Sequence, residues 1–135
     1  MKGISTSPSD RLTIMVLEEQ MAICLLPCDS PLPGWLDPRQ FHSVTRTTDE
    51  LSIVCPELSV PEGIRCEPGW RILQVKGPLD FSMTGILASL VTPLAEAGIG
   101  VFNISTYNTD YLLVKTGDLD QTVRILGNFC TVQFR

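Results

Sequence analysis

The sequence predicts an α+β fold built from two tandem units. Three observations indicate this: strand-type and helix-type hydrophobic patterns alternate in the second half, a less regular version fills the first half, and a segment rich in proline and glycine separates them. The chain has 135 residues and is 44% hydrophobic, which is enough for a genuine core. That length fits one ordinary domain or two small ones. We expect units at residues 11–66 and 67–135.

The second unit has the clearer pattern. Residues 71–76 read as a strand, and apolar residues recur at helical spacing from 83 to 97. Pro93 lies inside this helix and is expected to kink it, and Gly98 is a natural C-terminal stop.

Two more strands, a helix and a last strand complete this unit. Strands are expected at 101–106 and 111–115, and Asp118 and Gln121 resemble a capping box that opens a helix. Apolar and polar residues alternate from 130 to 134, which predicts the last strand. The order strand, helix, strand, strand, helix, strand predicts a ferredoxin-like unit, with both helices on one face of an antiparallel sheet.

The first unit is expected to be a degenerate copy. Two apolar runs, 12–17 and 21–26, flank a polar turn at 18–20 and suggest a hairpin. A proline-rich stretch follows, so the first helix must be short or missing. Strands are expected at 41–46 and 51–55, with a linker from 56 to 69. When the first strand–turn–strand segment is shifted by sixty residues, it aligns with the second, and Glu50 falls on Asp110. This is a weak internal repeat.

Charge and hydropathy exclude several classes of function. The net charge is −5, which disfavours binding to phosphate backbones and hence to nucleic acid. No apolar run reaches the length of a membrane span, and residues 1–10 are polar and lack a signal-like apolar core. We therefore expect a cytoplasmic protein with no membrane partner.

The cysteine and histidine content argues against a disulfide framework, a metal site and catalysis. The five cysteines are odd in number, and Cys24 and Cys28 lack a second pair with zinc-ligand spacing. His42 is the only histidine, and no nucleophile motif, phosphate loop or dinucleotide fingerprint is present. We expect no enzyme activity and no cofactor.

One constellation could bind a ligand. The loop from Gly77 to Gly85 leads into a helix whose first amides lack internal partners and favour a carboxylate. Asp110, in the polar turn after residue 105, could receive an ammonium group. Together they would fit a zwitterion. Structural roles stay open: Asp80 or Ser82 could be a helix N-cap, and Asp110 could satisfy turn amides.

The sequence also resembles a known family. The segments Gly98–Val114 and Phe41–Val54, the first containing Ile-Ser-Thr-Tyr-Asn-Thr-Asp, are similar to hallmark segments of ACT-domain proteins of the CASTOR type. The resemblance runs from about Leu12 to the end. It implies ACT folds, amino-acid binding and no catalysis. In that family's arginine sensors the ligand lies between the second and fourth of four units, so a two-unit chain would complete such a site as a homodimer.

The resemblance also implies site residues by position. Most come from the helix-leading loop and the polar turn, and two come from the other subunit's strand. Met83 stands where the arginine sensors carry an acidic residue that faces the guanidinium, so a free amino acid other than arginine is favoured. The implied residues are Asp80, Phe81, Ser82, Met83, Thr84, Gly85, Thr106, Tyr107 and Asp110, with Gly100 and Val101 from the partner.

Two other hypotheses are compatible with the same sequence. The chain could be a protein-interaction or dimerisation module with no small ligand. It could also be a detached regulatory subunit of an amino-acid biosynthetic enzyme.

Overall fold

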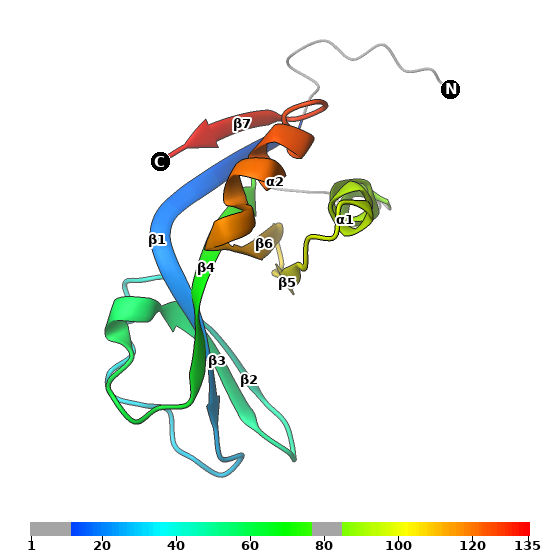
Figure 1. Cartoon of the computed structure of the whole chain (residues 1–135). Helices are drawn as coiled ribbons and strands as arrows, with labels where there is room; N and C mark the ends of the chain where they lie inside the picture. The colour runs from blue at the N-terminus through cyan, green and yellow to red at the C-terminus, as the bar shows by residue number, and fades with distance from the viewer. Residues whose placement is uncertain (1–11, 77–84) are drawn as a thin grey trace. The chain divides into compact units, whose positions relative to one another are not determined.

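The computed structural model describes residues 12–76 and 85–135 and divides the chain into two compact units. The N-terminal unit is Glu19–Arg71, and the C-terminal unit combines the chain up to Glu18 with Ile72–Arg135. Two long strands, β1 (Thr13–Leu26) and β4 (Cys66–Val75), contribute residues to both units (Figure 1). The boundary expected between residues 66 and 67 therefore falls at the start of β4.

The C-terminal unit contains the strand and helix order that the sequence predicts. After β4 come α1 (Ile86–Glu96), β5 (Phe102–Ser105) and β6 (Asp110–Lys115), then the 3-10 helix η3 (Thr116–Asp118), α2 (Leu119–Leu126) and β7 (Thr131–Phe134). β6 lies between β4 and β5, and β5 pairs with β6 antiparallel. The first half of β1 adds a strand that we did not expect here: it neighbours β4 and pairs parallel with β7.

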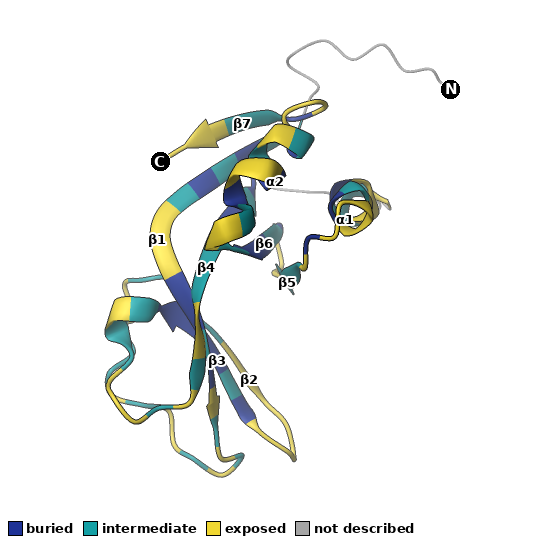
Figure 2. Cartoon of the chain, viewed as in Figure 1, coloured by how far each residue is buried: buried dark blue, intermediate teal, exposed yellow. Residues whose placement is uncertain are grey.

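Both helices pack on one face of this sheet, as predicted. The side chains of α1 and α2 that are buried join those of three strands in one hydrophobic cluster, and the outward helix faces are exposed (Figure 2). Burial of this apolar surface is the main driving force for the unit's folding. The cluster includes Ile14, Val16, Leu73, Val75, Leu90, Leu94, Leu112, Val114, Leu119 and Leu126.

The ends of the two helices differ in how well the sequence predicted them. α1 runs through Pro93 and stops before Gly98, which has φ +79°, and the Ile99 amide donates to the Leu94 carbonyl at 2.9 Å. This confirms the glycine stop. Asp118 occupies the expected N-cap position of α2 and is also the last residue of η3, but the capping box is wrong, because Asp118 makes no side-chain cap hydrogen bond.

The N-terminal unit is a sheet without the first helix. Its strand order is β2 (Ser43–Arg46), β3 (Leu51–Pro56), β1 and β4, with β1 and β3 antiparallel from Met21↔Pro56 to Leu26↔Leu51. The hairpin expected at 18–20 is wrong: β1 is continuous there, since the strand pairs with β7 before this point and with β3 after it.

Irregular segments cover one face of the sheet in the N-terminal unit. Trp35 and Leu36 from the proline-rich stretch, with Val60 and Ile64, pack against a buried cluster that contains Cys24, Ile53 and Cys55. The Arg46 guanidinium holds the covering segment by donating to the carbonyls of Cys28 and Ser30. The linker expected at 56–69 is therefore also wrong: it contains a 3-10 helix, η2 (Glu57–Ser59), core residues and the start of β4.

Candidate functional site

The loop between β5 and β6 is closed by one threonine at each end. Thr106 donates its amide to the Thr109 carbonyl at 2.8 Å, and its hydroxyl donates to the same carbonyl and accepts from the Thr109 amide. The buried Thr109 hydroxyl donates to the Val75 carbonyl of β4. Thr106 therefore serves the loop itself, and Tyr107, at the tip, is 82% exposed.

Asp110 ends a short chain of polar side chains on this hairpin. The Asn103 amide group donates to the Ser105 hydroxyl at 3.0 Å, and that hydroxyl donates to the Asp110 carboxylate. Asn103 Oδ1 is buried and has no hydrogen-bond partner among the described residues. The half-buried Asp110 carboxylate and the unsatisfied Asn103 amide oxygen thus lie on the same hairpin, and both are acceptors that suit a ligand with N–H donors.

The start of α1 lacks a capping side chain. Gly85 occupies the N-cap position with φ +87° and therefore cannot supply one. The helix N-terminus favours an anionic group. The other residues expected in this loop, from Asp80 to Thr84, lie outside the described residues, so their position relative to Asp110 stays a prediction.

Gly100 and Val101 lie just before β5, at the edge of the sheet. Gly100 is exposed, and a Cβ added there would meet nothing within 4 Å. Val101 is half-buried against the core of its own unit. The structure thus brings Thr106, Tyr107 and Asp110 onto one hairpin, with Gly100 and Val101 at the opposite end of β5.

The two hairpins repeat one another with a different offset from the one expected. Arg46↔Leu51 and Ser105↔Asp110 are the last pairs before each loop, and both positions are 59 residues apart. Thr47 closes its loop as Thr106 does, donating to the Glu50 carbonyl and accepting from the Glu50 amide. Glu50 therefore corresponds to Thr109 and not to Asp110.

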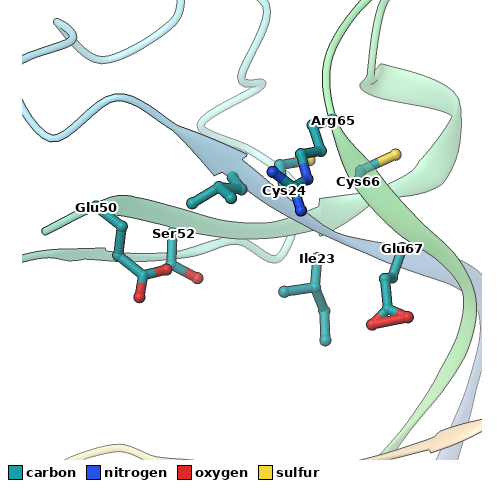
Figure 3. Close-up of a pocket in the computed structure, with 8 residues that line it drawn as sticks. Ile23, Cys24, Glu50, Ser52, Arg65, Cys66 and Glu67 are labelled. Atoms are coloured by element: carbon teal, nitrogen blue, oxygen red, sulfur yellow. The ribbon is translucent and has the colours of Figure 1, made fainter.

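Sequence reasoning missed a pocket of about 300 Å³ in the N-terminal unit. It lies across β3, β1 and β4, and it mixes charged, hydroxyl and apolar side chains (Figure 3). The only available signal was the alternation of Arg65 and Glu67 around Cys66, which we had assigned to a linker. The lining residues are Ile23, Cys24, Leu25, Glu50, Ser52, Arg65, Cys66 and Glu67.

Three thiols also gather in the N-terminal unit. Burial, with smaller contributions from the neighbouring Cys55 and Cys66 thiols, raises the pKa of the Cys24 thiol to about 12. Burial likewise raises the pKa of Cys55. Such thiols are poor nucleophiles and poor metal ligands at neutral pH. Within residues 12–76 and 85–135, no group of three histidine, cysteine or carboxylate side chains could hold a metal ion.

Known families match both units. An ACT-domain model matches residues 65–128, which include α1 and the β5–β6 hairpin, and a model of an N-terminal domain matches residues 19–63. Residues 65–128 therefore form an ACT domain. The predicted α+β, ferredoxin-like ACT fold is thereby confirmed.

Relatives of this ACT-domain protein include one that is named as an arginine sensor. It is 33% identical over 106 residues to the human putative protein CASTOR3P, covering 69% of this chain and 65% of that one. It is 38% identical over 99 residues to the bovine cytosolic arginine sensor for mTORC1 subunit 1, covering 65% of this chain and 30% of the sensor. The chain thus spans about two thirds of the length of CASTOR3P and about a third of the length of the bovine sensor.

A solved structure matches nearly the whole ACT protein. Protein Atu0741 from Agobacterium tumefaciens has a TM-score of 0.87 and 38% identity, covering 93% of this chain and 94% of that one. In the described part of the chain, no helix is long and apolar enough to cross a membrane.

Proposed function

We propose that the chain is a non-catalytic regulatory protein that binds a free amino acid at an interface between two ACT units. The ACT-domain match carries this proposal, because it covers both the start of α1 and the hairpin with Asp110. The related arginine sensors support an amino acid as the ligand class. The protein acts in the cytoplasm and uses no cofactor.

The ligand's two charged groups would be recognised by different elements. The uncapped start of α1 and the Asp80–Gly85 loop take the carboxylate. Asp110 takes the ammonium group, with Asn103 Oδ1 as a further acceptor. Gly100 and Val101 of a second copy close the site, so binding favours one packing of the dimer over others.

A thermal-shift screen of the twenty amino acids tests this proposal. A ligand present at a hundred times its Kd stabilises the folded state by about 2.7 kcal/mol. Asp110→Asn removes the charge while keeping an oxygen that can accept from Ser105, so it should abolish the shift. Asp120→Asn, at an exposed position on α2, is the matched control and should keep it.

Two results would count against the proposal. An Asp110→Asn variant that responds like the wild type would place the ligand elsewhere. A dimer that responds to none of the twenty amino acids at millimolar concentration would instead favour an interaction module without a ligand. Co-purification with a biosynthetic enzyme would favour a detached regulatory subunit.

A further inference from the structure

The pocket of the N-terminal unit is separate from the residues of the proposed site. Its volume of about 300 Å³ lies at the lower end of the range for small-molecule sites. In Figure 3, Glu50, Ser52, Ile23 and Glu67 extend toward the same side, and the Arg65 guanidinium turns toward β1. The pocket therefore presents both signs of charge around an apolar strand.

One wall of the pocket carries a pair of opposite charges. Arg65 and Glu67 flank Cys66 at the start of β4, so their side chains share a face while Cys66 takes the other. Two residues along a strand span about 7 Å. The Leu25 amide donates to the Arg65 carbonyl at 2.9 Å, which places Arg65 beside Leu25. This spacing suits the carboxylate and ammonium of one amino-acid head group.

The opposite wall carries a second carboxylate. Ser52 pairs with Leu25 on the far side of β1, and Glu50 lies two residues before it. Neighbouring strands are about 4.8 Å apart, so β3 and β4 are about 10 Å apart across β1. Ile23 and Leu25 form the apolar floor between the walls, and Leu25 is 39% exposed. Two carboxylates and one guanidinium leave the pocket with a net charge of −1.

We propose that this pocket binds an amino acid with a second cationic group at the end of an apolar chain, a diamino acid of the lysine type. Arg65 pairs with the carboxylate and Glu67 with the α-ammonium. The methylene chain lies over Ile23 and Leu25, and the terminal cation reaches Glu50. The ligand's net charge of +1 neutralises the pocket. This site goes beyond the proposed function, because it uses neither Asp110 nor a second copy.

Amide NMR spectra of isotope-labelled protein, titrated with three probes, test the proposal. The probes are L-lysine, L-norleucine, which lacks the terminal ammonium, and cadaverine, which lacks the carboxylate. Lysine should shift the amides of residues 23–25, 50–52 and 65–67, and it should bind about tenfold tighter than either other probe, since each loses one charged contact. Equal binding of all three, or no shifts with millimolar lysine, would overturn the proposal.

Variants separate this pocket from the proposed site. Glu50→Gln and Arg65→Ala change exposed side chains and should each weaken lysine binding by about tenfold. Glu62→Gln, also exposed in the same unit but outside the pocket, should change nothing. Asp110→Asn should leave lysine binding intact; if it abolishes binding, the lysine site is the one in the C-terminal unit, and the pocket proposal fails while the proposed function stands.

Discussion

At the scale of single residues, the thiol cluster links ionisation to stability. Cys24 is 1% exposed, and burial raises its pKa from 9.0 to about 12. The unfolded chain ionises this thiol near its ordinary pKa, whereas the folded chain keeps it neutral. The folded state therefore binds more protons between these two values, so its stability must fall as the pH rises through that window.

Cys24→Ala should remove this part of the pH dependence. In the wild type, Cys24 alone lowers the free energy of unfolding by about 1.4 kcal/mol per pH unit above its unfolded pKa. Urea unfolding at neutral and at strongly alkaline pH measures the slope, and Cys28→Ala, half-buried and outside the cluster, is the control. The pKa of Cys55 is also raised, so some dependence of stability on pH remains in both variants. Equal slopes for Cys24→Ala and the wild type would contradict the assignment.

At the scale of elements, local signals predicted well where one strong pattern decided the structure. The helix from 86 to 96 follows from its apolar spacing and from Gly98. The predictions failed where pairing between distant strands decided the local structure. The polar residues 18–20 suggest a turn, yet β1 stays extended because its two halves pair with different strands. Arg65 and Glu67 looked like a linker because prolines and glycines surround them, and only the sheet brings them to Glu50.

Substituting Gly98 tests the helix stop. Its φ of +79° is strained for any residue with a Cβ, and an added Cβ would meet nothing within 4 Å, so the cost is confined to the backbone. Gly98→Ala should lower the free energy of unfolding by about 1–2 kcal/mol. Gly117→Ala, equally open but without a positive φ, should be close to neutral. Chemical unfolding of both variants measures the difference, and equal stabilities would disprove the strain.

At the scale of the whole molecule, residues from distant parts of the chain complete each unit. The C-terminal unit takes in the first half of β1 beside β7, and the N-terminal unit takes in the first half of β4. The sequence shows each helical or strand pattern, but it does not show this sharing, because the sharing depends on pairing between distant segments, such as β1 and β7, whose paired residues are more than a hundred positions apart. The candidate site was likewise only partly predictable: the hairpin was found, and the pocket was not.

The homodimer is the prediction that belongs to this scale. β5 is the last strand of its sheet and pairs only with β6 in the described part of the chain, so its outer edge can accept another strand. Gly100 precedes that edge, and a side chain there meets open space within one copy. Gly100→Trp should therefore leave each copy folded but keep a second copy from approaching. Analytical ultracentrifugation should show a wild-type dimer, a Gly100→Trp monomer and a Gly117→Trp dimer. A wild-type monomer, or a Gly100→Trp dimer, would rule out an interface at this edge, and the amino-acid site at Asp110 would then have to be complete within one chain.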